Sequence, residues 1–397
     1  MASEKKVVSA PMQSWPVFES EEIEAVVKVL KSGKVNYWTG DQGKLFEAEY
    51  ARETGTEYAI AQANGTVSLE IALRALGVGN KDEVIVPPRT FVATASSVAL
   101  LGARPVFADV DIDSGNVTAD SISRVINQKT KAIIVVHLGG WPCEMDEIIG
   151  LAESYGLSVI EDCAQAHGAL YRGQRVGSIG RIGSFSFCQD KIISTGGEGG
   201  MLTTNDSRLW ERMWSFKDHG KSYDAVYRRS HNPGFRWLHE SFGTNARMTE
   251  MQAAIGRIAL RKLDDTLERR RKRAQIIAEG LRGIDGLIIP EPVDHVTHSC
   301  YRFYFRVDRE GLRDSWTRDR IMAEINESGV PCMSGSCSEV YLEKAFELAG
   351  MNPRTRLPVA RLLGETSLTF PTHQAMTEEE AYLIVEKARP VLRSAFR

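Results

Sequence analysis

The sequence lacks the short motifs that mark several common enzyme classes. No G-x-G-x-x-G lies between a strand pattern and a helix pattern, so a Rossmann site for a nicotinamide or flavin cofactor is not supported. His239-Glu240 begins like the motif of zinc proteases, but the second histidine of that motif does not follow. The G-x-S-x-G motif of many hydrolases is also absent. The function must therefore be sought in other side chains.

The sequence also has few cysteines, no long apolar run and little net charge. Its six cysteines are scattered and form no C-x-x-C pair, which favours small buried side chains in a reducing compartment over disulfides or a zinc site. The apolar run 91–103 is too short to span a bilayer, and no apolar segment follows the lysines of the first ten residues. A formal net charge of −3 gives no electrostatic reason to expect nucleic-acid or membrane binding. We expect a cytoplasmic protein without a metal site.

Length and composition are those of a soluble protein with more than one domain. The chain has 397 residues, of which 43% are hydrophobic and 25% charged. Short apolar runs alternate with segments of helical period. This alternation predicts an α/β fold whose large domain has a mainly parallel sheet flanked by helices. The expected strands are 58–61, 83–87, 105–107, 132–136, 158–160 and 184–187, and the expected helices include 67–76, 90–101 and 145–155.

A long helical pattern over 248–281 marks the expected domain boundary. Beyond it, a strand pattern at 301–307 and two later helical patterns indicate a smaller α/β domain. We place the boundary near residue 260. The predicted domains are a large cofactor-binding domain, 1–260, with an N-terminal arm over about 1–20, and a small C-terminal domain, 261–397.

The basic run Arg269-Arg270-Arg271-Lys272-Arg273 lies within the long helical pattern. Five consecutive basic residues invite a nucleic-acid interpretation. Asp264, Asp265 and Glu268 precede them, so ion pairs one helical turn apart are available. We therefore expect a solvent-exposed helix face here.

Polar side chains follow three of the expected strands. Asn64-Gly65-Thr66 opens a helix, where backbone N–H groups and the helix dipole suit a phosphate, although an ordinary helix cap explains the same residues. Asp162 follows a buried strand, and a carboxylate there is costly unless it meets a cation. Lys191 precedes a turn rich in glycine. Because ligands of parallel sheets bind beyond the carboxyl ends of the strands, these positions converge on one predicted site.

Lys191 and Asp162 each allow a catalytic and a structural interpretation. We expect Lys191 at the end of a rigid strand in mostly uncharged surroundings, where desolvation lowers the pKa of the amine and favours a nucleophile able to form a Schiff base. The alternative is a lysine with its ammonium group in water. Asp162 suits a protonated pyridine nitrogen, or it caps the next turn. A cap does not explain Gln165 and His167, which follow at once.

Taken in order, these segments resemble the sugar aminotransferases of the DegT/DnrJ/StrS type, which are pyridoxal 5'-phosphate (PLP) enzymes with the aspartate-aminotransferase fold, fold type I. The resemblance covers most of the chain, from about Trp15 to Ile384. The segments that carry it are Gly65-Thr66, 82–87, Thr90-Phe91, 102–107, Glu161-Asp162, Gln165, 167–169, Lys191, 197–200 and 245–248.

The resemblance implies a role for each matching position. Lys191 would form a Schiff base with the cofactor and later move a proton between the two reacting carbons, and Asp162 would keep the pyridine nitrogen protonated. Each active site would be built across the interface of a homodimer. The remaining cofactor-binding residues would be Gln165 at the ring hydroxyl, Phe91 on the ring face, Gly65, Thr66 and Ser186 at the phosphate, and Asn245 reaching that phosphate from the neighbouring subunit.

The resemblance also implies the reaction. An amino donor, by family analogy glutamate, gives its nitrogen to the cofactor, and a keto sugar then takes it. We expect a nucleotide-linked 4-keto-6-deoxy sugar for a surface polysaccharide such as lipopolysaccharide, or for a glycosylated product. Relatives that dehydrate sugars carry histidine at position 191, so Lys191 favours transamination. The alternatives are a cyclitol (inosose) aminotransferase that uses glutamine, and a PLP-binding regulatory protein that has lost turnover.

The sequence departs from the family at two positions near the expected site. Asn64 stands where many relatives have serine, and Ala246 where many have tyrosine. The first could alter the phosphate site and the second the floor of the sugar pocket. The loop 217–237 offers candidate sugar contacts, which are equally compatible with ordinary surface residues.

Overall fold

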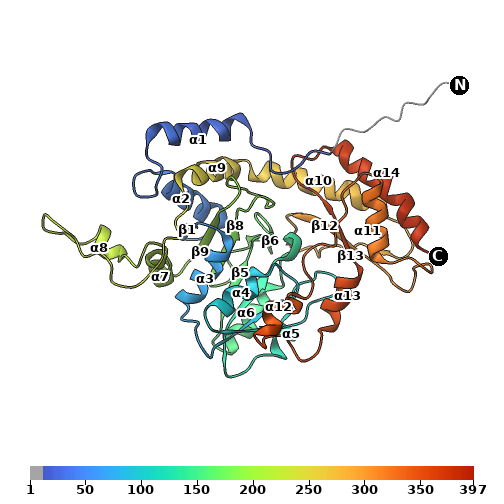
Figure 1. Cartoon of the computed structure of the whole chain (residues 1–397), viewed down its shortest axis with the longest axis horizontal. Coiled ribbons are helices and arrows are strands. Elements are labelled where there is room, and N and C mark those ends of the chain that lie inside the picture. The colour runs from blue at the N-terminus through green and yellow to red at the C-terminus, as the bar shows by residue number, and fades with distance from the viewer. Residues whose placement is uncertain (1–11) are drawn as a thin grey trace.

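A computed structural model describes residues 12–397 (Figure 1). The first part of the expected N-terminal arm, residues 1–11, lies outside the described residues. The strands are β1 (Tyr58–Gln62), β2 (Glu83–Val86), β3 (Arg104–Phe107), β4 (Thr130–Val136), β5 (Ser158–Asp162), β6 (Leu170–Tyr171), β7 (Gln174–Arg175), β8 (Ile182–Ser186), β9 (Gly200–Thr204), β10 (Leu287–Ile288), β11 (Val296–Thr297), β12 (Arg302–Val307) and β13 (Ser367–Pro371).

Helices separate most of these strands, as the sequence predicts. The helices are α1 (Ser20–Ser32), α2 (Gln42–Thr54), α3 (Gly65–Ala75), α4 (Ala93–Leu100), α5 (Ala119–Ser123), α6 (Met145–Ser154), α7 (Ser207–Lys217), α8 (Tyr223–Tyr227), α9 (Glu250–Arg261), α10 (Leu263–Leu281), α11 (Arg318–Glu327), α12 (Lys344–Leu348), α13 (Pro358–Thr366) and α14 (Glu378–Ala395), with 3₁₀ turns at Leu138–Gly140 and Val340–Leu342.

A seven-stranded sheet forms the centre of the molecule, with the order β1-β9-β8-β5-β4-β2-β3. Strands β8, β5, β4, β2 and β3 are parallel to one another. Strand β9 runs antiparallel to both of its neighbours, β8 and β1. Strand β1 therefore points the same way as β8, and six strands end at the same edge. This confirms the predicted α/β fold with a mainly parallel sheet.

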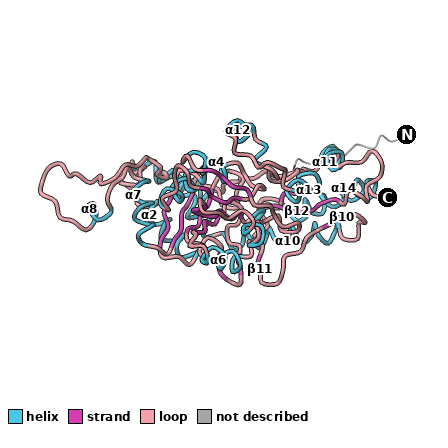
Figure 2. Tube along the Cα trace, turned by 90° about the horizontal axis from the view of Figure 1, so that it is seen from below, coloured by secondary structure: helices cyan, strands magenta, loops and turns pink. Residues whose placement is uncertain are grey.

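Helices lie on both sides of this sheet (Figure 2), and alternate residues of its strands pack against one side or the other. Val84 and Val86 pack with α3, α4 and α7 on one face, whereas Ile85 packs with α5 and α6 on the other. Phe185 of β8 packs on that second face with α2 and α9. Because both faces are covered, the strands are apolar almost throughout, as expected for a parallel sheet buried on two sides.

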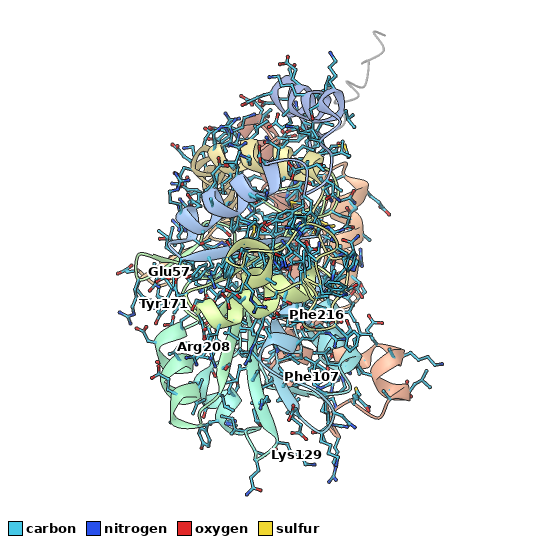
Figure 3. All side chains as sticks on the ribbon, turned by 90° about the vertical axis from the view of Figure 1, so that its left-hand side faces the viewer. Glu57, Phe107, Lys129, Tyr171, Arg208 and Phe216 are labelled. Carbon is cyan, nitrogen blue, oxygen red and sulfur yellow. The ribbon has the colours of Figure 1, made fainter. Side chains whose placement is uncertain are left out.

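The β3 edge of the sheet is covered by a segment from the C-terminal third of the chain. Phe107, labelled in Figure 3, ends β3 and contacts the rings of Tyr341 and Phe346 at centroid distances of 5.3 and 5.9 Å. On the opposite face, Ala360 and Leu363 of α13 join the core that contains Ile85. Residues well beyond 260 thus contribute to the core of the large sheet, and the division at 260 stays a prediction.

A second core lies around the three-stranded antiparallel sheet β10-β12-β13. Phe305, Leu368 and Ile384 are buried there, and α10 packs along α14 (Figure 1). The helical pattern that we expected to be continuous is two helices, because the chain leaves helical geometry at Lys262, with φ −92° and ψ 4°. Helix α9 packs on α1 and α2 in a core that also contains Leu263 and Leu267 at the start of α10, whereas the later part of α10 packs in the second core.

The expectation of a solvent-exposed basic face on α10 is wrong for two of its residues. Arg270 is 1% exposed and Arg273 is 8% exposed. Nη1 of Arg270 donates to the Tyr301 carbonyl at 3.2 Å, and Nε of Arg273 donates to the Met376 carbonyl at 2.8 Å. The tertiary fold brings these carbonyls over the helix, which the spacing of charges within α10 cannot show. Arg269 follows the prediction and pairs with Asp265 at 2.9 Å.

Two further expectations concern the burial of the cysteines and the lack of a segment that could span a membrane. All six cysteines are free, and Cys143, Cys163 and Cys332 are buried as predicted. Cys337 is exposed, which contradicts the expectation of buried thiols, because its loop lies at the surface. No helix within residues 12–397 is long and apolar enough to cross a membrane.

Candidate active site

Gly65 and Ser186 meet where β1 and β8 end. A Cβ atom placed on Gly65 would lie 2.6 Å from Cβ of Ser186, so only glycine fits there. Gly200, between them on β9, is equally restricted, because its Cβ would lie 2.6 Å from the Asn64 backbone. Oδ1 of Asn64 accepts from N–H of Val67 at 2.9 Å and caps α3. The first N–H groups of a helix have no acceptor within it, so Gly65 and Thr66 present free donors beside the Ser186 hydroxyl.

His167 fixes the backbone of Ser186. Its Nε2 lies 2.9 Å from the Ser186 carbonyl, which can only accept, so Nε2 carries the proton. Its Nδ1 then accepts from the hydroxyl of Tyr50 at 2.9 Å. Burial lowers the pKa of His167 to about 3, so the ring is neutral and keeps this arrangement at physiological pH. His167 is therefore a positioning residue.

Asp162 ends β5 as a buried carboxylate with no arginine or lysine bonded to it among the described residues. Oδ2 accepts from the hydroxyl of Thr94 at 2.9 Å, and Oδ1 accepts from N–H of Ala164 at 3.2 Å. Burial raises the pKa of the carboxyl, while these two hydrogen bonds and the charge of Lys191 act in the opposite direction. A buried carboxylate with this environment suits a cationic group of a bound molecule.

Lys191 lies in the turn after β8, and the side chains of Asp190 and Tyr301 lie close to its amine. Nζ lies 3.2 Å from the carboxylate of Asp190 and 5.3 Å from the ring centre of Tyr301. The Tyr301 hydroxyl in turn donates to Asp190. Burial lowers the pKa of the amine, but Tyr301 and Asp190 raise it by more, so the pKa of Lys191 lies above its ordinary value. The expected uncharged surroundings and lowered pKa are wrong, because a carboxylate is adjacent.

The other predicted site residues occupy different positions around this edge. Oε1 of Gln165 accepts from N–H of Gly139 at 2.7 Å, and its Nε2 donates to Ser336 at 3.3 Å, so the amide is held on both sides. Phe91 precedes α4 and leaves 66% of its surface exposed. Asn245, in the connection between α7 and α9, is exposed and makes a backbone bridge with Asp218. The roles assigned to these residues stay predictions.

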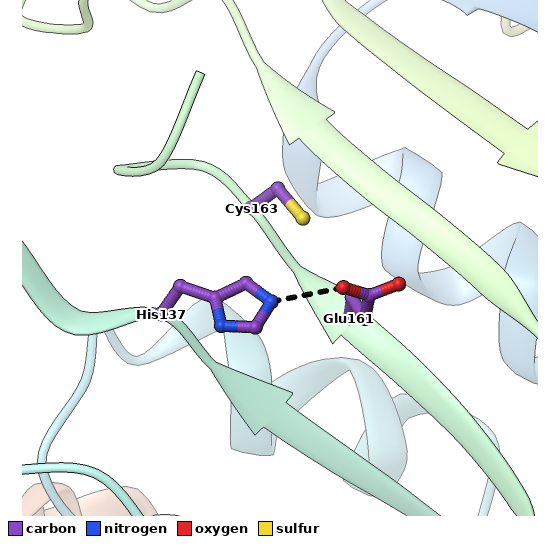
Figure 4. A group of neighbouring side chains, drawn as sticks. All are labelled: His137, Glu161 and Cys163. Atoms are coloured by element: carbon purple, nitrogen blue, oxygen red, sulfur yellow. Dashed lines mark hydrogen bonds and ion pairs between the residues drawn. The ribbon is translucent and has the colours of Figure 1, made fainter. Parts of the chain in front are cut away.

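A second polar cluster, His137, Glu161 and Cys163, lies where β4 and β5 end (Figure 4). Nε2 of His137 lies 3.0 Å from Glu161, and N–H of Cys143 donates to Nδ1 of His137 at 3.0 Å. Both ring nitrogens are thus used. Burial, together with Glu161, raises the pKa of the Cys163 thiol well above its usual range. The cluster is a hydrogen-bonded support for the loop after β7.

Sequence reasoning missed Thr94, Asp190 and Tyr301. Asp190 could have been found, because it adjoins Lys191 in the chain. Thr94 is one of several hydroxyl residues in α4, and nothing in the local pattern marks it. Tyr301 immediately precedes β12, more than a hundred residues beyond Lys191, and only the fold brings the two together.

Comparison with known proteins places this geometry in a family. The profile of the DegT/DnrJ/EryC1/StrS aminotransferase family matches residues 16–389. The chain belongs to this family. The matched range includes every residue of the candidate site, from Gly65 to Tyr301.

Members of the family with known structures or activities resemble the chain over nearly its whole length. An aminotransferase from Psychrobacter cryohalolentis has a TM-score of 0.95 at 54% identity, covering 96% of this chain and 98% of that one. UDP-N-acetyl-3-dehydro-alpha-D-glucosamine 3-aminotransferase of Acidithiobacillus ferrooxidans is 37% identical, with 89% of each chain covered. GDP-perosamine synthase of Escherichia coli O157:H7 is 34% identical, covering 88% of this chain and 90% of the relative.

Proposed function

We propose that this chain is a PLP-dependent aminotransferase that moves an amino group from glutamate to a nucleotide-linked keto sugar. One observation carries the proposal above all. A lysine, a buried carboxylate without a cation and a tight glycine–serine contact at a helix start lie along one edge of the sheet. These are the groups that a phosphorylated pyridine aldehyde requires.

The residues present fit PLP. Gly65 leaves no Cβ between the start of α3 and Ser186, so the N–H groups of Gly65 and Thr66 and the Ser186 hydroxyl would hold the phosphate. Asp162 would pair with the ring nitrogen, Gln165 would approach the ring hydroxyl, and Phe91 would cover a ring face. When bound, the cofactor supplies an electron sink next to the carbon that loses or gains a proton.

The protein would contribute charge and proton transfer. Asp162, with Thr94 and the Ala164 N–H as donors, keeps a negative charge where the pyridine nitrogen would lie. Nζ of Lys191, once free of the cofactor, would take up a proton and deliver it to the neighbouring carbon. Asp190 and Tyr301 hold that amine within a small volume, so its reach is restricted to the site.

The substrate class follows from the relatives, which are named for UDP-linked and GDP-linked sugars. Because these relatives differ in the nucleotide, the family does not define the nucleotide for this chain. We propose a nucleotide-linked keto sugar and keep a 4-keto-6-deoxy sugar, destined for a surface polysaccharide, as the specific candidate. The cytoplasmic location stays a prediction.

We further propose a homodimer with shared active sites. Asn245 is exposed in the single chain although the family pattern gives it a phosphate contact. Phe235, Trp237 and Phe242, which precede it, are 77%, 82% and 98% exposed on the protruding segment around α8 (Figure 1). Such a group of exposed aromatic side chains is typical of a surface covered by another chain.

A spectroscopic titration tests the proposed reaction. The protein loaded with PLP should show the visible band of cofactor joined to lysine, glutamate should bleach it, and a nucleotide-linked keto sugar should restore it. The Lys191→Ala variant should bind PLP without that band and should not turn over. Restoration by inosose but not by nucleotide sugars would favour the cyclitol enzyme, and a band unaffected by glutamate and glutamine would favour the regulatory protein.

A further inference from the structure

A cavity of about 270 Å³ lies behind the active site, between α10, β12 and the loop that follows β3. Its walls are mainly apolar and include Ile112, Leu138, Trp141, Phe303 and Phe305. Lys191, Asp162, Gln165 and the other candidate site residues do not line it. The cavity is therefore separate from the proposed PLP site.

The cavity wall carries more positive than negative charge. Arg89, Arg271, Arg302 and Arg306 line it, together with Asp113 and Glu291. Arg306 pairs with Asp113 at 3.1 Å, and Glu291 pairs with Arg282 at 3.0 Å, so both carboxylates are neutralised. Within residues 12–397, the other three wall arginines form no ion pair with a carboxylate.

Arg89 is the unusual member of this set, because it is only 2% exposed. Its Nη1 and Nη2 donate to the hydroxyls of Ser338 and Ser367 at 3.3 and 3.0 Å. Its Nε has no hydrogen-bond partner among the described residues. A buried guanidinium with only hydroxyl partners carries an uncompensated charge, which is costly unless an anion joins it.

Tyr304 and Ser336 connect the cavity to Gln165 of the candidate active site. Tyr304 lines the cavity below Arg89, whose guanidinium carbon lies 5.5 Å from the ring centre. The Tyr304 hydroxyl lies 3.2 Å from Oγ of Ser336, which accepts from Gln165. Gly139 closes the remaining space, since its Cβ would lie 2.8 Å from the Tyr304 ring.

We propose that this cavity is a binding site for a small carboxylate with an apolar body, distinct from the active site. The apolar walls would take the body, and Arg89 with its unpaired neighbours would take the carboxylate. The mainly apolar walls disfavour a strongly hydrated anion without an apolar body, such as inorganic phosphate. The inference does not depend on the proposed reaction, because none of its residues belongs to the PLP site.

Calorimetric titration of the PLP-loaded protein with 3-phenylpropanoate tests this site, with 3-phenylpropan-1-ol as the uncharged probe of equal size. We expect one carboxylate per chain, bound at least about tenfold more tightly than the alcohol, since hydrogen bonds to charged groups contribute that much. Equal affinity of the two probes, or no binding of the carboxylate, would overturn the proposal. Inorganic phosphate should not displace the carboxylate.

Two pairs of variants locate the bound probe. Ala278 of α10 lines the cavity, so Ala278→Phe should abolish binding, whereas Lys272→Phe, on the exposed face of the same helix, should leave it unchanged. Arg89→Gln should remove the preference for the carboxylate, and Arg89→Lys should retain part of it. Binding that survives Ala278→Phe, or that glutamate displaces competitively, would place the probe elsewhere and refute the site. If Arg89→Gln does not fold, the comparison of Ala278→Phe with Lys272→Phe decides whether the probe binds in the cavity.

Discussion

Oγ1 of Thr94 donates a hydrogen bond of 2.9 Å to Oδ2 of Asp162, and both side chains are buried. Thr90 lies 2.8 Å from the same Thr94 hydroxyl. This short chain of hydroxyls in and before α4 stabilises the ionised form of a carboxyl whose burial raises its pKa. The hydroxyls therefore help to keep the negative charge that the proposed reaction needs.

We expect Thr94→Val to move the acid limb of the pH–rate profile to higher pH. The loss of the donor removes a stabiliser of the ionised carboxylate, so the pKa of Asp162 rises further and more of it is protonated at neutral pH. kcat/KM near pH 7 should fall about tenfold, the value of one hydrogen bond to a charged group. Ser97→Ala removes another buried hydroxyl of α4 that does not contact Asp162 and should leave the profile in place.

We expect Asp190→Asn to speed covalent capture of PLP by the apoprotein near neutral pH. Capture needs the neutral amine, and the pKa of Lys191 is above its ordinary value because Tyr301 and Asp190 outweigh burial. Without the carboxylate the pKa falls, so the neutral fraction at a given pH rises. Stopped-flow measurement of the visible band against pH should show the midpoint moved to lower pH. An unchanged midpoint would show that Asp190 does not raise the pKa of Lys191. Asp206→Asn, which changes a carboxylate distant from Lys191, is the control.

Mixing two inactive or impaired variants tests whether Asn245 acts across a dimer. In a mixed dimer of Lys191→Ala with Asn245→Ala, one site contains Lys191 and an intact Asn245 from the other chain. Activity should therefore rise above that of either variant alone after the two are mixed and allowed to exchange subunits. If Asn245 acts within its own chain, no mixed dimer contains an intact site and no rise follows. Sedimentation of the mixture verifies that dimers are present.

We expect Glu161→Gln to destabilise the fold by about 3 kcal/mol or more, since a hydrogen bond to a charged group contributes about 1.5–3 kcal/mol and several such bonds are weakened together. Glu161 is 0% exposed and accepts from N–H groups of Gly177, Ile179 and Gly180 as well as from His137. An amide nitrogen in its place would face those donors. Urea unfolding measures the loss, with the exposed residue Glu153 of α6, changed to Gln, as control. A stabilising effect of zinc on the parent protein would contradict the assignment of this cluster as a hydrogen-bonded support.

Most of the sheet and its flanking helices could be predicted, because their signals are local. Apolar runs such as Ile133–Val135 and the cap at Asn64 carry enough information within a few residues. The break at Lys262 could not be predicted from periodicity, since apolar residues continue through it. It follows from packing, where α9 contacts α1 and α2 and α10 contacts α14.

The positions of Lys191, Asp162 and Gln165 near the sheet edge could be predicted, but the electrostatics around them could not. Lys191, Asp162 and Gln165 stand out through order and spacing, and their positions at the sheet edge follow from parallel strands. The charge on Lys191 depends on Tyr301, which belongs to the other end of the chain. The burial of Arg270 and Arg273 was missed for the same reason, because carbonyls from distant segments replace water there.

The antiparallel strand β9 pairs with both β1 and β8, the two strands that lead to the predicted phosphate-binding residues. Gly200 is paired with Ser186 on one side and with Gln62 on the other, so a single backbone position aligns both. An insertion of one residue before Gly200 would shift β9 against two neighbours at once, and neither could compensate without turning its own side chains to the opposite face. Insertions and deletions are therefore tolerated in the turns on either side of β9 but not within the strand itself. This makes β9 a poor segment for loop engineering in this enzyme.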